Sequence, residues 1–182
     1  MASSRLALLR GINVGGKNKL PMSDLAKIFE TSGCGKVRTF IQSGNVIFTA
    51  GSKTCDTLAV KVASAISDRF GYRTPVILRT ADQLRQIVAN NPYLTAGEPT
   101  EDLLKTLHVM FLADLPAPER VTLLDPDRSP PDTFTVRGQE VYLKLPNGAG
   151  NSKLTNAWFD SRLQTVSTSR NWNTVTRLLE MM

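Results

Sequence analysis

The hydrophobic pattern of the first ninety residues alternates between short apolar runs and segments with apolar residues at helical spacing. Such alternation is typical of buried strands connected by amphipathic helices. In the strand over 37–49, the sequence Ser43-Gly44-Asn45 predicts a bulge or tight bend, because glycine inside a strand usually marks irregular backbone. The predicted elements are a strand over 5–12, a helix between Pro21 and Gly33, the interrupted strand over 37–49, a helix between Asp56 and Gly71, a strand over 74–79, and a helix opened by the Thr80–Gln83 capping box and ended by Pro92.

The pattern lapses after Pro92 among polar and acidic residues, and residues 93–105 are therefore predicted to be a linker. Apolar spacing then resumes to the end of the chain. The elements predicted there are a strand over 107–113, a helix over 118–124, a loop over 128–131, a hairpin with strands over 133–136 and 141–145, a helix capped by Ser152 and a last helix from Trp172.

This order predicts an α+β fold of two small layered subdomains, the first of them ferredoxin-like with helices on one face of a sheet. The predicted subdomains are residues 1–92 and 106–182. No sequence repeat is strong enough to indicate a duplication.

Composition favours a reduced, soluble protein. The chain has 182 residues and only two cysteines, Cys34 and Cys55, which are too few for a disulfide scaffold. No apolar run approaches the roughly 20 residues that span a bilayer, and the run after Arg5 is too short for a signal peptide. We therefore expect a cytoplasmic location and no membrane partner.

The net charge of +6 is distributed unevenly. Residues 1–91 carry 13 Lys and Arg against 5 Asp and Glu, whereas residues 92–127 carry 2 against 7 and residues 128–182 carry 7 against 4. A basic first half attracts phosphate-bearing partners at long range. The alternative is a solvated basic surface that serves solubility.

The first candidate motif spans residues 8–19, where an apolar strand gives way to glycines, amides and cations without an acid. The N–H groups of Gly15 and Gly16, together with Lys17, form a candidate anion-binding loop, although the spacing matches neither a dinucleotide fingerprint nor a P-loop. The alternative is a flexible turn. Arg10 is either a substrate-facing guanidinium or one half of an ion pair with Asp24 or Asp82.

A second cluster of amides and a hydroxyl, Gln42, Ser43 and Asn45, lies at the bend in the second strand. If the first two strands are neighbours, this cluster converges with Asn13 and Lys17 on one rim of the sheet. The alternative is that Ser43 and Asn45 satisfy the backbone of their own turn.

Three segments carry a resemblance to a known family. They are residues 8–19, Gln42-Ser43-Gly44-Asn45-Val46 and Ser169-Arg170-Asn171-Trp172-Asn173-Thr174, and together they closely resemble the bacterial family called domain of unknown function 1697. The resemblance covers nearly the whole chain and implies the same two-part layout, but no activity. It also implies that Lys153, Arg170, Asn171 and Thr174 are candidate ligand-binding residues.

Familiar catalytic sets and metal-ligand spacings do not occur in the sequence. The single histidine, His108, is interpreted as a sheet-edge residue without a catalytic partner, and the acidic pairs Glu101-Asp102 and Asp125-Asp127 as solvated loop residues. No metal, cofactor or reaction type is therefore assigned, and whether the protein is an enzyme stays open.

Three functions are compatible with these observations. The first is binding of a small phosphorylated or nucleotide-like anion at a polar site between the subdomains. The second is non-specific nucleic-acid binding through an extended basic face. The third is a structural or interaction role without a ligand.

Overall fold

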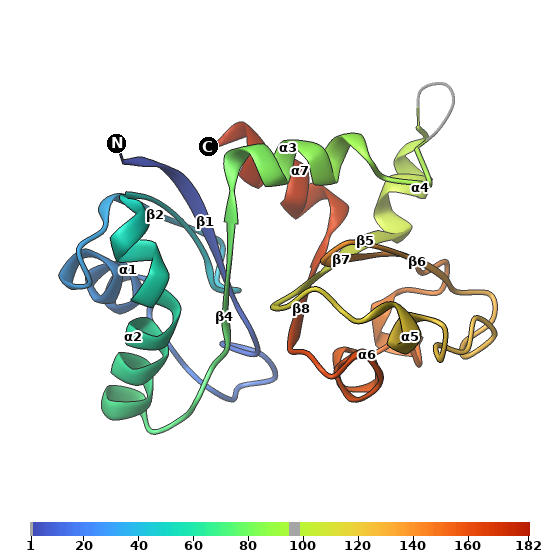
Figure 1. Ribbon diagram of the computed structural model, residues 1–182, viewed down its shortest axis with the longest axis horizontal. Helices are drawn as coiled ribbons and strands as arrows, with labels where there is room; N and C mark the ends of the chain where they lie inside the picture. Colours follow the sequence, from blue (N-terminus) through green and yellow to red (C-terminus); the bar gives the residue numbers. More distant parts are fainter. Residues whose placement is uncertain (1, 95–98) are drawn as a thin grey trace. The chain divides into compact units, whose positions relative to one another are not determined.

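The computed structural model describes residues 2–94 and 99–182, and the chain divides into two compact units (Figure 1). Unit 1 comprises Met1–Leu84 together with Leu178–Met182, and unit 2 comprises Arg85–Arg177. The division between Leu84 and Arg85 therefore falls before the predicted linker, residues 93–105. Residues 95–98 of that segment lie outside the described residues.

Unit 1 has the ferredoxin-like order of elements. Its sheet runs β2-β3-β1-β4 with antiparallel neighbours throughout, and α1 and α2 contact each other and cover one face (Figure 1). The elements are β1 (Ser3–Leu9), α1 (Met22–Thr31), β2 (Gly35–Phe40), β3 (Asn45–Ala50), α2 (Ser52–Phe70) and β4 (Val76–Thr80), followed by α3 (Ala81–Ala89). The α+β class and the layered arrangement predicted from the sequence are confirmed.

Alternation along the strands of unit 1 explains which side chains meet the helices. Ala7 on β1 pairs with Val46 on β3 and Leu78 on β4, so these side chains share a face. Against this face pack the apolar stripes of both helices, with Phe29 of α1 and Val62 of α2 completely buried. This packing forms the core of the unit.

The predicted strand over 37–49 is in fact two strands joined by a tight turn. Ile41 and Gly44 both have positive φ, 48° and 75°, and the chain reverses between them so that Phe40 pairs with Asn45. The interruption predicted at residues 43–45 is therefore a reversal of the chain rather than a bulge. The start of α2 also differs, since it begins at Ser52 after Gly51 instead of at Asp56.

Gly44 allows this turn to lie against the end of β1. Its carbonyl accepts a hydrogen bond from the N–H of Leu9 at 2.8 Å. A Cβ atom at this position would lie 2.7 Å from the Cβ of Leu9 and 2.9 Å from the Cδ1 of Ile12, which is closer than side chains pack. A glycine is therefore required here for both its positive φ and its small size.

Unit 2 repeats the topology of unit 1. Its sheet runs β6-β7-β5-β8 with antiparallel neighbours, which is the same order with β5 in the place of β1. The elements are α4 (Glu101–Thr106), β5 (Leu107–Leu112), α5 (Pro118–Val121), β6 (Thr133–Arg137), β7 (Glu140–Lys144), the 3-10 turn η1 (Ala149–Asn151), α6 (Asn156–Leu163), β8 (Ser167–Asn171) and α7 (Trp172–Glu180). The end of α7, from Leu178, belongs to unit 1. The core lies where Met110, Leu143 and Phe159 meet.

Two sequence predictions for unit 2 are wrong. Strand β8 was not predicted, because all five of its residues, Ser167–Asn171, are polar and only pairing with β5 makes them a strand. Helix α6 begins at Asn156 and is capped by the Thr155 hydroxyl, which accepts the N–H of Trp158, rather than by Ser152. The capping box predicted at Thr80 and Gln83 is confirmed by reciprocal hydrogen bonds of 2.8 and 3.0 Å.

Across residues 2–94 and 99–182, no helix combines the length and the apolar character needed to cross a membrane.

Candidate functional site

Asn13 joins the first two sequence motifs. Its Nδ2 donates to the carbonyl oxygens of Leu20 and Gln42, both at 2.9 Å, and its Oδ1 accepts the N–H of Leu20 at 2.8 Å. Asn13 has a φ of 53°, a left-handed conformation that asparagine tolerates better than most residues. The structure therefore brings Asn13 and Gln42 together at the end of β1, with the Asn13 amide holding the backbone of two segments.

Residues 13–18 form a small hairpin, which we call the β1–α1 hairpin. The N–H of Asn13 donates to Asn18 O, and the N–H of Lys17 donates to Val14 O, both at 3.0 Å. Gly15 and Gly16 occupy the turn with φ values of 57° and 75°, as a two-residue hairpin turn requires. A tight turn therefore occupies the residues for which the sequence predicts either a flexible turn or an anion-binding loop, and anion binding there stays a prediction.

The hairpin is anchored at its base and exposed at its tip. The Asn18 side chain donates to Gly11 O at 2.8 Å, and the Tyr72 hydroxyl donates to Asn18 O at 3.0 Å. Gly15, Gly16 and Lys17 are exposed. The turn therefore presents backbone N–H groups and one ammonium group to solvent from a fixed base.

The second cluster occupies the β2–β3 turn beside this hairpin. Asn45 is completely buried, and its Nδ2 donates to Phe40 O at 3.1 Å and to the Ser43 hydroxyl at 3.0 Å. Ser43 is half-buried and Gln42 is exposed. In this turn the Asn45 side chain stabilises the backbone by its hydrogen bond to Phe40 O, while Gln42 is exposed to solvent.

Arg10 follows β1 and is half-buried. Its N–H donates to Pro75 O at 3.1 Å, and its carbonyl accepts the Thr74 hydroxyl at 2.7 Å, so the segment before β4 fixes its backbone. Asp24, one of its two predicted partners, forms an ion pair with Arg69 at 2.5 Å.

In unit 2, two of the four candidate residues belong to a helix cap. Asn171 ends β8, and its Oδ1 accepts the N–H of Thr174 at 2.8 Å across the first turn of α7. Arg170 is buried and donates to the Thr168 hydroxyl at 2.9 Å and to Ser169 O at 2.7 Å, and burial lowers its pKa to about 10. Lys153 is exposed, and its N–H donates to the Ser129 hydroxyl at 3.0 Å.

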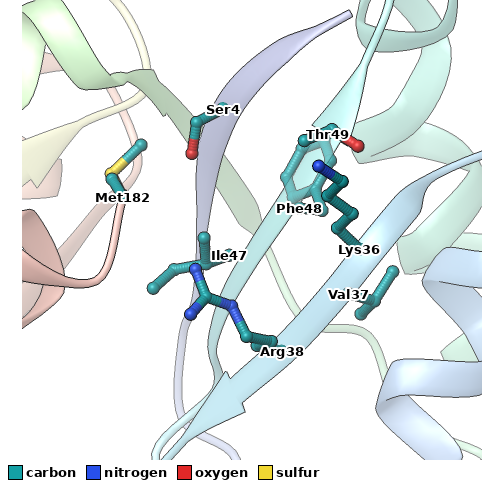
Figure 2. Close-up of a pocket in the computed structure, with 8 residues that line it drawn as sticks. All are labelled: Ser4, Lys36, Val37, Arg38, Ile47, Phe48, Thr49 and Met182. Carbon is teal, nitrogen blue, oxygen red and sulfur yellow. The ribbon is translucent and has the colours of Figure 1, made fainter.

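Unit 1 also contains a cavity of about 460 Å³ over strands β2, β3 and β1 of its sheet (Figure 2). Lys36 and Arg38 of β2 line it together with Ser4 of β1 and Thr49 of β3. Arg38 also donates a hydrogen bond to Met181 O. These residues could not be recognised as a site from the sequence, because two cations around a single valine are typical of an exposed edge strand.

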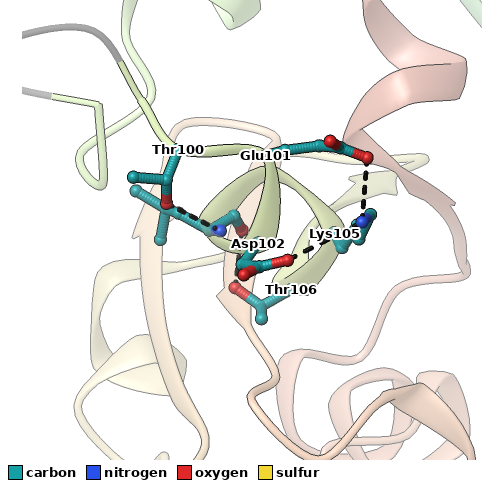
Figure 3. Close-up of polar contacts among 6 residues, drawn as sticks. Thr100, Glu101, Asp102, Lys105 and Thr106 are labelled. Carbon is teal, nitrogen blue, oxygen red and sulfur yellow. Dashed lines mark hydrogen bonds and ion pairs between the residues drawn. The ribbon is translucent and has the colours of Figure 1, made fainter.

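The acidic pair Glu101-Asp102 lies in a helix rather than in the expected loop (Figure 3). Thr100 caps α4 by accepting the N–H of Leu103 at 3.2 Å, and Lys105 lies 2.8 Å from Glu101 and 3.6 Å from Asp102. Both carboxylates are highly exposed and serve as the acidic first turn of the helix. In the part of the chain that the structure describes, no group of three or more His, Cys, Asp or Glu is placed to hold a metal ion.

The family comparison covers the first two sequence motifs, whereas the third, Ser169–Thr174, lies beyond the matched residues. A family model described as "Protein of unknown function (DUF1697)" matches residues 2–142. The chain belongs to the DUF1697 family. Among solved structures, this DUF1697 chain is similar to the conserved bacterial protein SP0830 from Streptococcus pneumoniae, with a TM-score of 0.72 and 21% sequence identity over 100% of this chain and 99% of that one. This likeness shows a shared fold, and no curated protein matches the chain.

Proposed function

We propose that unit 1 binds a small phosphate-bearing anion at the tip of the β1–α1 hairpin. The supporting observation is that Gly15 and Gly16 present adjacent N–H groups that make no hydrogen bond within residues 2–94 and 99–182. Lys17 follows them directly, and all three residues are exposed. Successive N–H groups in a turn, reinforced by a cation, are a recurrent way to hold an anion.

Within this proposal the residues of the first two motifs divide into two roles. Asn13 and Asn45 position the backbone, because their side chains are engaged with carbonyl groups. Gly15, Gly16 and Lys17 contact the anion, and Gln42 and Ser43 flank it from the neighbouring turn. Participation of Arg10 and of Lys153, Arg170, Asn171 and Thr174 stays a prediction, as does a site between the subdomains.

The proposal is tested by calorimetric titration with inorganic pyrophosphate at low and at physiological salt. Lys17→Ala should weaken binding about tenfold, the loss typical of one charge-assisted hydrogen bond. Lys61→Ala, which removes an exposed lysine from α2, is the matched control because it changes the net charge equally. Equal losses in the two variants would assign the effect to overall charge and contradict the proposal.

The cavity beside Lys36 and Arg38 is a second location in unit 1 where an anion could be held (Figure 2). If Arg38→Ala abolishes pyrophosphate binding and Lys17→Ala does not, the hairpin is not the site. Binding of RNA or DNA alone, lost at physiological salt, would instead favour the nucleic-acid function.

A further inference from the structure

Unit 2 contains a cavity of about 190 Å³ at the start of α6, apart from every residue assigned above to the anion site. Leu143, Leu145 and Leu154 form its apolar walls. The polar residues that line it are His108, Thr155, Asn156 and Ser169. His108 lies on β5, an inner strand of the sheet, so its interpretation as a sheet-edge residue is wrong. It shares a face with Met110, which pairs with Ser169 on β8.

A chain of hydrogen bonds behind the cavity determines which atoms Ser169 can offer. The Ser167 hydroxyl donates to Asp160 Oδ1 at 2.6 Å and accepts from Asn156 Nδ2 at 2.8 Å. The amide of Asn156 is thereby oriented with Oδ1 toward Ser169, whose hydroxyl donates to it at 3.3 Å. Because its only proton is used, Ser169 offers lone pairs to the cavity.

The ring of His108 is likewise held in one tautomer. Its Nδ1 lies 3.3 Å from Thr106 O, and a carbonyl can only accept, so Nδ1 carries the proton and Nε2 is left with a lone pair. Burial lowers the pKa of His108 below 6.5, which keeps the ring neutral at neutral pH. His108 and Ser169 therefore both act as hydrogen-bond acceptors.

We propose that this cavity binds a small molecule that carries an amino group on an apolar body, with its N–H groups donating to His108 and Ser169. An apolar cavity of about 150 Å³ is large enough for a benzene ring, so a singly substituted ring fits the volume here. A carboxylate or phosphate is disfavoured beside His108 and Ser169, because its oxygens would face the lone pairs of two acceptors. The proposal concerns unit 2 and is independent of the anion site in unit 1.

The first test uses aniline as the probe and toluene as its counterpart of similar size without a donor. His108 is the only histidine in the chain, so the nitrogen signals of a labelled imidazole belong to this residue alone. In the free protein they should show a protonated Nδ1 and an unprotonated Nε2. Aniline should shift the Nε2 signal saturably, at concentrations at least tenfold below those needed for toluene. A protonated Nε2, or equal responses to both probes, overturns the proposal.

A pair of serine variants tests the second acceptor. Ser169→Ala removes the hydroxyl at the cavity and should weaken aniline binding roughly twofold to tenfold, without changing the response to toluene. Ser161→Ala removes an exposed hydroxyl of α6 and should leave the affinity unchanged. A loss of the same size in both variants contradicts the assignment of Ser169.

A pair of alanine variants tests the location without removing a hydrogen bond. Ala149 lines the cavity, whereas Ala157 is exposed on α6. Ala149→Leu should fill the space and abolish the response of His108 to aniline, and Ala157→Leu should preserve it. Because both side chains are exposed, both variants are expected to fold. Retained binding in Ala149→Leu places aniline elsewhere and refutes the proposal.

Discussion

Replacement of Gly44 by alanine tests the contact between the β2–β3 turn and the end of β1. The new Cβ atom would lie 2.7 Å from Leu9 Cβ and 2.9 Å from Ile12 Cδ1, and neither neighbour can move easily because both are buried. Overpacking of this kind costs roughly 1–3 kcal/mol. The left-handed backbone conformation adds about 1–2 kcal/mol to this cost for a residue with a Cβ. The lower conformational entropy of the unfolded alanine variant offsets about 0.4–1 kcal/mol of the loss.

Gly71→Ala provides the matched control. Gly71 has nearly the same φ, 78° against 75°, but no atom lies within 4 Å of the position of its missing Cβ. Both variants therefore share the backbone effects, and only Gly44→Ala adds the steric clash. We expect the free energy of unfolding to fall by roughly 1 kcal/mol in Gly71→Ala and by roughly 2–4 kcal/mol in Gly44→Ala.

Urea unfolding followed by far-ultraviolet circular dichroism measures both values in the same unit, because Gly44 and Gly71 both belong to unit 1. Tryptophan fluorescence reports separately on the unfolding of unit 2, which carries neither substitution, since Trp158 and Trp172 both lie in that unit. If the two variants lose stability equally within about 0.5 kcal/mol, the close approach of Gly44 to Leu9 has no energetic weight and the reasoning is refuted.

Two further predictions concern unit 1. Asn13→Ala should lower the free energy of unfolding by roughly 1–3 kcal/mol, because the Leu20 N–H loses its acceptor. As a control, Asn173→Ala at an exposed position of α7 should change this free energy by less than about 0.5 kcal/mol. Similar losses for the two variants in chemical denaturation would contradict the role of Asn13. Burial beside Cys55 raises the pKa of Cys34 from 9.0 to about 11, so the folded state retains a proton that the unfolded state releases. Stability should therefore fall as the pH rises from 9 through 11, and Cys34→Ala should remove that part of the decline; an unchanged pH profile in the variant would show that Cys34 is not its source.

Where helices and strands alternate with clear apolar spacing, the sequence predicted the fold correctly. The stripe formed by Leu25, Phe29 and their neighbours on α1 can be recognised without a structure, because only one face of that helix is apolar. Strand β8 could not be recognised in this way. Its residues are polar, and their extended conformation depends on pairing with β5, which is more than fifty residues earlier in the chain.

In the candidate site, too, some features could be predicted from the sequence and others could not. Neighbouring strands made it possible to expect Asn13 near the second motif, and the hydrogen bond to Gln42 O brings them together. The roles of the side chains could not be deduced, because they depend on partners distant in sequence. Ser169 is an acceptor in the unit 2 cavity only because Asp160, Ser167 and Asn156 orient its proton.

The division of unit 1 into two separate stretches of the chain has a consequence for biosynthesis. Its last segment, Leu178–Met182, follows the whole of unit 2, and Leu178 is completely buried. At about 5–20 residues per second, a ribosome needs roughly 5–20 s to make the intervening 93 residues, Arg85–Arg177. During that interval unit 1 lacks its last segment, Leu178–Met182, whereas unit 2 is formed by one continuous stretch of the chain. The last residues of unit 1 are therefore made only after the whole of unit 2.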